Sequence, residues 1–392
     1  MGIQKKSSTC KMKVIIEEQY VCTPTPWGIP YYAIQLTNKL LERNKFNYGL
    51  TFFDQNKERN NRKWIEKYFG NYAVPIYECN ELSYRTAFSD KYAFSEKSYN
   101  VYTGAEGDVF HFLQLISIPD NLKGASVVTV HDMLPVKFPE FYSTSVVEWF
   151  NLGIERLNKI QPTVIADSTA TKKDILEFTK ITSENIHVIP LAYDEKKSSV
   201  QKSADVIKEL GIAFPYILYL GRVDIRKNIV RLIEAFESIS SKYSDVKLVI
   251  AGEPHLGSEE VALKVKNSKY KSRIIMPGYV SDEQKHALYS EALAFIFTSL
   301  YEGFGLPLLE AMTCGSPVIT SNVSSMPEVA GDAAILVDPY RVEQLAHEIE
   351  RVISSKSLQE ELRNKGFAQS KKFSWSKTAE MTEEVYRIAV AK

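Results

Sequence analysis

Short apolar runs alternate with amphipathic segments along the first half of the chain. A strand buried on both faces of a sheet is apolar along its length, whereas a helix lying on the sheet repeats its apolar positions every three to four residues. The alternation therefore favours an α/β fold with a parallel sheet covered by helices on both faces. The expected strands are residues 13–16, 48–53, 109–115, 126–130 and 163–166, and the expected helices are residues 30–41, 146–160 and 171–178.

The same alternation restarts after a polar stretch rich in lysine and serine, residues 194–208, which is the expected linker. A chain of 392 residues is also too long for one ordinary core, so two domains are expected. The predicted fold is two Rossmann-like, doubly wound domains, residues 11–195 and 209–375, facing each other across a cleft at the carboxyl ends of their strands. The expected strands of the second domain are residues 216–220, 246–251, 274–276, 292–298 and 317–320, and its helices are residues 229–240, 281–290, 306–313, 342–354 and 358–371.

The most informative motif is Glu302-Gly303-Phe304-Gly305-Leu306-Pro307-Leu308-Leu309-Glu310, which leads from an expected strand into an expected helix. Proline is favoured in the first helical turn, because its missing N–H would have no partner there. The backbone N–H groups at the helix start and the positive end of the helix dipole form a site for an anion. Glu302 precedes this site and Glu310 lies one turn inside the helix, so amides at 303–306 stand between two carboxylates. Such a site suits a nucleotide sugar, although two glutamates at this spacing would be a coincidence in most proteins.

A basic loop follows the strand expected at residues 216–220. Gly221 permits a tight exit from this strand, and Arg222 and Lys227 emerge at its carboxyl edge. One guanidinium and one ammonium group can hold the two phosphates of a diphosphate. The competing interpretation is ordinary solvated charge on a loop.

Five further residues are candidates for contacts with the ligands. Tyr279 and Val280 are in a position to contact a nucleotide base. His131 follows a buried strand of the first domain, and an imidazole near neutral pH can donate a hydrogen bond to a sugar hydroxyl or accept one; His111 is a weaker candidate of the same kind. Gly28, between the first strand and the first helix, is an acceptor-side candidate, because glycine lets the backbone approach a ligand closely. For each of the five, a purely structural role is the alternative.

Composition narrows the classes of function. Lys plus Arg and Asp plus Glu both number 48, so nucleic acid is not an expected partner. The four cysteines have no C-x-x-C spacing, which argues against a zinc site and suits a reducing cytoplasm. No apolar stretch approaches the roughly 18 residues of a membrane span, and the first residues lack the apolar core of a signal peptide, so a cytoplasmic protein is expected. The dinucleotide fingerprint, the P-loop and the D-x-D motif are absent from the sequence, and neither a cofactor nor a metal is expected.

Three motifs together resemble a known family. They are G-R-V-D-I-R-K-N at residues 221–228, E-G-F-G-L-P-L-L-E at residues 302–310 and C-G-S-P-V at residues 314–318. In this combination they resemble the retaining GT-B glycosyltransferases of family 4, the class called glycosyl transferases group 1. The match is dense in the second domain and thin over residues 11–195. The resemblance implies two Rossmann-like domains and a last helix, within residues 376–392, that crosses back onto the first domain.

The resemblance also implies roles for the matching residues. Arg222 and Lys227 would bind the diphosphate of the donor, and Glu302 would face the transferred sugar. The backbone amides of residues 303–305 would contact phosphate, and Glu310 would hold the ribose hydroxyls.

On the acceptor side the resemblance implies less. His131 would lie beside the hydroxymethyl group of the sugar. Family members often carry a Gly-Gly pair in the first loop, where this chain has Trp27-Gly28, so the acceptor-side assignment of Gly28 departs from the family pattern. The Y-E-G-F-G-L-P form of residues 301–307 is similar to bacterial O-antigen and capsule mannosyl- and rhamnosyltransferases.

The expected activity is transfer of a hexose, mannose or a similar sugar, from a GDP- or UDP-linked donor to a hydroxyl of a saccharide or lipid-linked saccharide. The anomeric configuration would be retained and no metal would be needed. The departing phosphate oxygen can take the proton of the acceptor on the same face, and the alternative is that Glu302 acts as a nucleophile. A sugar phosphorylase on the same fold and a non-catalytic sugar-nucleotide-binding partner are the competing functions.

A lipid-linked acceptor would bring the first domain to the inner face of the cell membrane as a peripheral contact. Basic and aromatic side chains favour such a contact with an anionic surface. The candidate residues are Lys57, Arg59, Arg62, Lys63 and Trp64.

Overall fold

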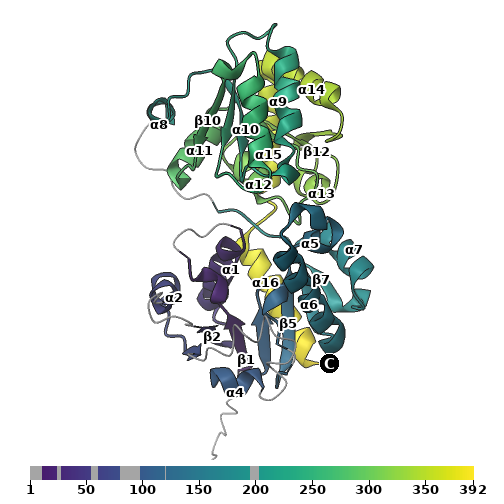
Figure 1. Ribbon diagram of the computed structural model, residues 1–392. Helices are drawn as coiled ribbons and strands as arrows, with labels where there is room; N and C mark the ends of the chain where they lie inside the picture. The colour runs from purple at the N-terminus through teal and green to yellow at the C-terminus, as the bar shows by residue number, and fades with distance from the viewer. Residues whose placement is uncertain (1–10, 24–27, 54–60, 80–97, 120, 195–202) are drawn as a thin grey trace, which may run out of the picture.

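Two α/β bodies, stacked one above the other, make up the protein (Figure 1). The computed structural model describes residues 11–23, 28–53, 61–79, 98–119, 121–194 and 203–392. We call the body formed by residues up to 194 together with helix α16 (Trp375–Val390) the N-terminal lobe. The body formed by residues 203–370 is the C-terminal lobe.

The described part of the N-terminal lobe has a seven-stranded parallel sheet in the order β3-β2-β1-β4-β5-β6-β7. Its central strands are mostly apolar and mostly buried, so both faces are covered. The strand order reverses between β1 and β4, and doubly wound folds bind ligands at the carboxyl ends of the strands beside such a point. The strands are β1 (Lys13–Glu17), β2 (Asn47–Phe53), β3 (Ile76–Cys79), β4 (Val109–Phe112), β5 (Ala125–Val130), β6 (Thr163–Ala166) and β7 (Ile186–Val188).

The described part of the C-terminal lobe repeats this plan with a six-stranded parallel sheet in the order β10-β9-β8-β11-β12-β13. Its strand order reverses between β8 and β11, so the loops that follow these two strands lie at the ligand-binding edge. The strands are β8 (Tyr216–Leu220), β9 (Lys247–Ala251), β10 (Ile274–Gly278), β11 (Phe295–Phe297), β12 (Val318–Ser321) and β13 (Ala334–Val337).

Helices alternate with these strands, and several begin at a side-chain cap. Ser168 accepts a hydrogen bond from the Thr171 N–H at the start of α7, and Ser281 with Gln284 forms a capping box at the start of α11. The helices of the N-terminal lobe are α1 (Ile29–Arg43), α2 (Arg62–Phe69), α4 (Tyr99–Thr103), α5 (Leu134–Lys137), α6 (Thr144–Ile160) and α7 (Thr169–Phe178). Those of the C-terminal lobe are α8 (Ser203–Glu209), α9 (Ile229–Ile239), α10 (Ser258–Asn267), α11 (Asp282–Glu291), α12 (Leu306–Thr313), α13 (Met326–Ala330), α14 (Val342–Ser354) and α15 (Lys356–Ser370).

The predicted fold class of two doubly wound α/β units is confirmed, and the differences concern short elements. The edge strands β3, β7 and β13 were not predicted, because each is only three or four residues long and partly exposed. The expected linker contains helix α8, which packs against α11 of the C-terminal lobe. Residues 195–202 of that linker lie outside the described residues.

The last helix, α16, crosses back onto the N-terminal lobe, as the resemblance implied. It packs on α1 and on β4, β5 and β6. Its Glu383 carboxylate accepts hydrogen bonds from Nε and Nη2 of Arg43 at 2.9–3.1 Å, and Thr378 donates to the carbonyl of Pro190 at 2.8 Å. The chain therefore passes twice between the lobes. Within the described residues, no helix has the length and apolar character needed to span a membrane.

Candidate active site

Two loops of the C-terminal lobe meet at the carboxyl ends of β8 and β11. The first loop ends in a single 3-10 turn, Ile225–Lys227, and the second leads from Glu302 into α12. Gly305 precedes α12 with φ of +100°, a left-handed conformation that glycine adopts without strain. Pro307 lies in the first helical turn, so the start of α12 has the geometry predicted from the sequence.

Glu302 is held between two cations at this edge. Its Oε1 lies 2.5 Å from Nζ of Lys227, and its Oε2 lies 2.8 Å from Nη1 of Arg226. All three side chains are at most 15% exposed. Burial alone would raise the pKa of Glu302, but the charges of Arg226 and Lys227 outweigh it and lower that pKa to about 2. Burial and the neighbouring charge of Arg226 lower the pKa of Lys227.

Arg226 is the site residue that sequence reasoning missed. Arg222, the predicted partner of Lys227, is exposed, and its carbonyl accepts a hydrogen bond from Tyr219 at 2.6 Å. The structure thus brings Lys227 together with Glu302 and leaves Arg222 at the surface. The available signal was the adjacent pair Arg226-Lys227, because consecutive residues of a tight turn can reach one carboxylate from two sides.

The basic loop is fixed by side chains on both sides of it. Asp224 accepts a hydrogen bond from the N–H of Lys227 at 3.2 Å. Asn228 has φ of +60°, and its amide donates to the carbonyls of Thr298 at 3.1 Å and Pro339 at 2.7 Å. These bonds tie the loop to the end of β11, so the cations are positioned before any ligand arrives.

His131 comes from the N-terminal lobe, directly after β5. Its Nδ1 lies 2.6 Å from a carboxylate oxygen of Asp167, and its Nε2 lies 2.9 Å from the carbonyl oxygen of Leu113. Both partners are acceptors, so both ring nitrogens donate and the ring is an imidazolium. Burial opposes this charge, but Asp167 outweighs the burial and raises the pKa of His131. The expected hydrogen bond from this ring to a sugar hydroxyl would require one of these two partners to be released.

His111 does not lie at the edge of the sheet where the sequence placed it as a weaker candidate. It is fully buried within β4, and its two ring nitrogens contact Tyr386 and Thr129. Burial, followed by the charge of His131, lowers the pKa of His111 to about 3. The ring is therefore neutral and is part of the interior.

The two lobes touch at Gly303. Its carbonyl accepts hydrogen bonds from Oγ of Ser168 at 2.6 Å and Oγ1 of Thr171 at 3.1 Å. A Cβ at position 303 would lie 2.0 Å from the carbonyl oxygen of His131, so only glycine fits. The loop that carries Glu302 and the strand end that carries His131 are thus in van der Waals contact.

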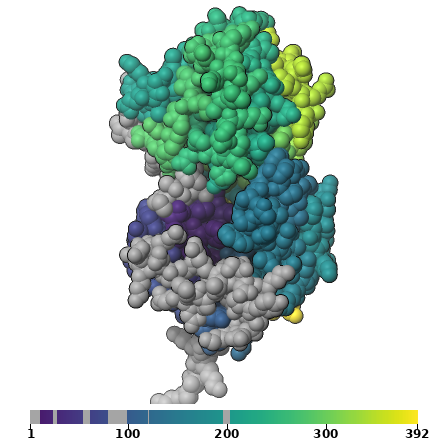
Figure 2. Space-filling view, in the orientation of Figure 1, coloured from purple at the N-terminus to yellow at the C-terminus, as the bar shows by residue number. Residues whose placement is uncertain are grey.

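A second contact between the lobes lies beside the first. The hydroxyl of Tyr301 donates to Asp174 of α7, and Nζ of Lys137 lies 2.5 Å from the same carboxylate. The carboxylate of Glu328 on α13 accepts from the N–H of Thr169 at 2.9 and 3.2 Å. Figure 2 shows the blue surface around α5 and α6 meeting the C-terminal lobe above it. These polar contacts close the lobes over the Glu302 loop.

Glu310 lies in α12, one turn after Glu302's loop, and is partly buried. The hydroxyl of Tyr289 donates to its Oε2 at 3.1 Å. Among the other predicted donor-site residues, Phe304 is buried against Phe373, with ring centroids 6.0 Å apart, and Leu306 is the first residue of α12.

The remaining predicted residues are placed as follows. Tyr279 is 50% exposed after β10, whereas Val280 is buried. Gly28 precedes α1 with φ of +62° and has open space at its Cα. Its neighbour Trp27 lies outside the described residues.

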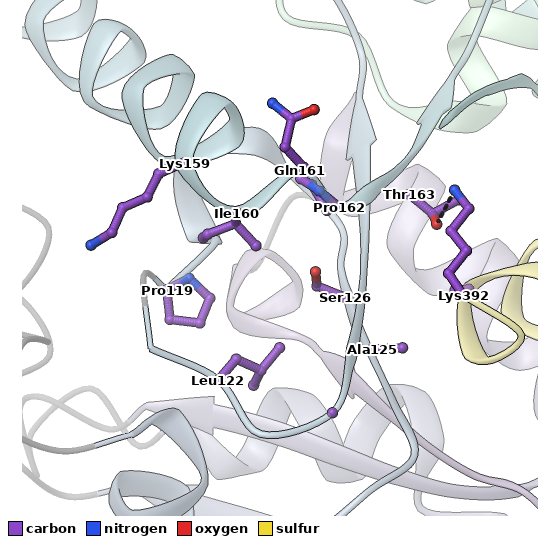
Figure 3. A pocket seen from close by; sticks show the side chains of 12 residues that line it. Pro119, Leu122, Ala125, Ser126, Lys159, Ile160, Gln161, Pro162, Thr163 and Lys392 are labelled. Atoms are coloured by element: carbon purple, nitrogen blue, oxygen red, sulfur yellow. Dashed lines mark hydrogen bonds between the residues drawn. The ribbon is translucent and has the colours of Figure 1, made fainter. Parts of the chain in front are cut away.

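A hollow of about 430 Å³ lies elsewhere in the N-terminal lobe, at the amino ends of β5 and β6 (Figure 3). It is lined by polar side chains that include Ser126, Lys159 and Thr163, and Nζ of Lys392 lies 3.3 Å from the Thr163 hydroxyl. The hollow opens at the edge of the sheet opposite to His131, and its lining contains none of the predicted site residues. It is therefore not part of the candidate site.

The two doubly wound units have the fold of the GT-B glycosyltransferases. Residues 184–369 match the family described as "Glycosyl transferases group 1". The chain contains a domain of this family and is a glycosyltransferase.

Particular relatives refine this similarity. The chain is 28% identical to the O-antigen chain mannosyltransferase B of Escherichia coli over 96% of its own length and 100% of that protein. It is 31% identical to the serotype-specific mannosyltransferase WbdA of E. coli, but there the alignment covers 69% of this chain and 34% of the relative. The chain thus spans about a third of the length of WbdA.

Solved structures share the fold over nearly the whole chain. HepE of Anabaena, solved in complex with UDP and glucose, superposes with a TM-score of 0.73 at 18% identity, over 95% of this chain and 98% of that one. WaaG, a glycosyltransferase involved in lipopolysaccharide biosynthesis, superposes with a TM-score of 0.69 at 16% identity, over 95% and 99% of the two chains. At these identities the likeness establishes the GT-B fold.

Proposed function

We propose that the protein transfers a mannosyl residue from a GDP- or UDP-linked donor to a hydroxyl of a saccharide or lipid-linked saccharide, with retention of configuration. The observation that carries the proposal is the buried cluster of Arg226, Lys227 and Glu302 beside the start of α12. The full-length similarity to an O-antigen chain mannosyltransferase supports mannose as the sugar and a polysaccharide precursor as the acceptor. Retention rests on the resemblance to family 4.

Arg226, Lys227 and the N–H groups at the start of α12 would bind the diphosphate of the donor. Negative charge grows on the leaving diphosphate as the glycosidic bond breaks, and fixed cations in a buried site stabilise that charge without reorganising. Arg222, on the same loop, would reach the outer phosphate from the surface. This charge stabilisation would be supplied by the protein's own side chains.

Glu302 is better suited to orienting the sugar than to attacking it. Its lowered pKa keeps the carboxylate ionised, so it accepts hydrogen bonds from sugar hydroxyls and does not act as a general acid. Both of its oxygens are engaged by cations, which lowers their nucleophilicity. The departing phosphate oxygen would then take the proton of the acceptor hydroxyl on the same face.

A ligand screen followed by product analysis tests this proposal. GDP, UDP, dTDP and ADP and their sugars are compared by thermal shift, because a ligand that binds the native state raises the melting temperature. The preferred donor is then incubated with saccharide acceptors, and the anomeric configuration of the product is read by NMR. Transfer that requires inorganic phosphate would instead identify a phosphorylase, and binding without any product would identify a non-catalytic partner.

Glu310→Ala is expected to weaken donor binding, raising the KM for the donor more than it lowers kcat. A contact to ribose is the same before and during the reaction, so its loss affects ground state and transition state alike. Initial rates over a range of donor concentrations measure the split. Tyr289→Phe, which removes only the hydroxyl that orients Glu310, should give a smaller change in the same direction.

Transfer is expected to persist in excess EDTA. The sequence lacks a D-x-D motif, and two buried cations stand where a metal would otherwise neutralise the diphosphate. The measurement compares initial rates before and after chelation. Activity that is lost on chelation and restored by Mg²⁺ or Mn²⁺ would contradict this arrangement of the site.

The expected membrane contact falls partly on α2. Trp64 and Tyr68 stack with centroids 6.4 Å apart, and the ammonium groups of Lys63 and Lys67 lie 5.0 and 4.9 Å from the centroid of Trp64. Arg62, another predicted contact, is paired with Glu66 and Glu78. Lys57 and Arg59 lie outside the described residues.

We predict that the protein binds anionic vesicles and that salt weakens this binding. Each lysine near an anionic surface contributes about 1 kcal/mol, so Lys63→Glu with Lys67→Glu should reduce binding by about thirtyfold or more. Co-sedimentation with phosphatidylglycerol vesicles measures it, and Lys242→Glu, at an exposed lysine of the other lobe, is the control. Binding that is indifferent to both salt and charge reversal would remove α2 as the contact.

A further inference from the structure

A chain of buried hydrogen bonds runs from the crossing helix α16 toward His131. The hydroxyl of Tyr386 lies 2.8 Å from Nδ1 of His111, and Nε2 of His111 lies 2.9 Å from Oγ1 of Thr129. The same oxygen lies 2.9 Å from the hydroxyl of Tyr32. The ring of Tyr32 then packs edge to face on the imidazole of His131, with centroids 4.8 Å apart. The four residues that form the chain are each at most 2% exposed.

The two hydrogen bonds of His111 in this chain have a defined donor and acceptor. The pKa of His111 is lowered to about 3, so at neutral pH one ring nitrogen donates and the other accepts. Among the described residues, His111 is the hydrogen-bond partner of the Tyr386 hydroxyl, and a buried hydroxyl proton without an acceptor is costly. Tyr386 therefore donates to Nδ1, and the Nε2–H group of His111 donates to Thr129.

The chain joins four elements that would otherwise be held by apolar packing. Tyr386 belongs to α16, His111 to β4, Thr129 to β5 and Tyr32 to α1. Replacing a fully satisfied buried polar chain by apolar groups is often neutral for stability, so stability alone does not account for it. A satisfied chain does specify one arrangement of its members, and here the last member packs on His131.

We propose that Tyr386 and His111 are positioning residues for His131, so that the seating of α16 on the N-terminal lobe fixes this imidazole beside the transferred sugar. The inference rests on the proposed function, because it takes His131 to face the donor sugar. α16 leaves the C-terminal lobe at Ser374 and Trp375, so its seating depends on how the lobes are placed. The series of hydrogen bonds thereby makes the position of His131 sensitive to the placement of the two lobes.

Kinetics of Tyr386→Phe and Tyr32→Phe test the proposal, with Tyr48→Phe as a matched control. Tyr48 is also buried and also meets α16, through Glu383 at 3.5 Å, but it is not part of the chain. We expect Tyr386→Phe and Tyr32→Phe to lower kcat by about tenfold to a hundredfold, the range for a misplaced active-site group, with little change in the KM for the donor. Tyr48→Phe should keep kcat within about twofold, at a similar change in melting temperature.

Ring ¹⁵N NMR of the histidines supplies a readout that does not require substrate. The wild type should show His111 as the neutral Nε2–H tautomer, and the pH at which His131 titrates should shift in Tyr386→Phe and Tyr32→Phe but not in Tyr48→Phe. An Nδ1–H tautomer of His111, or an unchanged kcat and unchanged His131 titration in Tyr386→Phe, would overturn the proposal. If no nucleotide sugar is a substrate but the His131 titration still responds to Tyr386→Phe, the proposed function fails and the positioning chain stands.

Discussion

Lys227→Ala is expected to lower kcat by about 10²–10³, the range for removing one preorganised group that stabilises charge in the transition state. In the proposed mechanism Lys227 contacts a diphosphate whose charge grows as the glycosidic bond breaks, so this contact would strengthen at the transition state and its loss would appear in kcat. Glu302 keeps Arg226 as a partner in this variant, so the fold should survive. Steady-state rates over donor concentration, with a melting curve for each variant, measure the effect.

Two comparison variants make this result specific. Lys242→Ala removes an exposed lysine of the same lobe that pairs with Glu350, and it should leave the rate within about twofold of wild type, as expected for a surface substitution. Arg222→Ala tests whether that exposed arginine joins the diphosphate when the donor binds. Near-normal kcat in both Lys227→Ala and Arg222→Ala would contradict the diphosphate assignment and the mechanism built on it.

Gly303→Ala is expected to reduce activity by about a hundredfold or more, since a displacement of about 1 Å in an active site costs about that much. A Cβ at this position would lie 2.0 Å from the carbonyl oxygen of His131. Both groups in this contact are fixed to the backbone, so neither can rotate away. The lobes must therefore move apart, and Glu302 must move with its loop. Activity assays and small-angle X-ray scattering of the wild type and of Gly303→Ala measure the loss of activity and the separation of the lobes.

Gly366→Ala is the matched control for this variant. Its Cβ would lie 3.4 Å from the nearest atom, in the side chain of Met312, which is ordinary contact, and alanine favours a helix over glycine. Wild-type activity in Gly303→Ala, with unchanged scattering, would show that the contact between the lobes is not needed for transfer.

Most of the fold could be predicted because its signals are local. Most strands of both sheets are predominantly apolar runs, and the start of α12 is marked by Gly305 and Pro307. The edge strands β3, β7 and β13 were missed, because a strand of three or four half-exposed residues carries little hydrophobic pattern. The contacts between polar residues depend on the order of strands that are far apart in the sequence. No single segment of the sequence contains information on that order.

The candidate site shows the same limit. Lys227 and Glu302 were identified from their places at strand ends, and the structure puts them 2.5 Å apart. Arg226 was missed because Arg222 follows the strand more directly, and only the tight turn at residues 225–227 decides which arginine points inward. The two partners of His131 are Leu113, directly after β4, and Asp167, directly after β6. These strands flank β5 in the sheet, and that order could not be inferred from spacing.

The pairing of Glu302 with Arg226 and Lys227 supplies the proposed donor site with its own counter-ion. In the free protein the Glu302 carboxylate is the counter-ion of both cations, and in the proposed mechanism the diphosphate of the donor would share these cations with it. The cations are never left facing each other unneutralised, which would be costly for buried like charges. Fewer dissolved anions are then released from the site when the donor binds. The affinity for the donor should therefore fall less steeply with ionic strength than it would in a site with two unpaired cations.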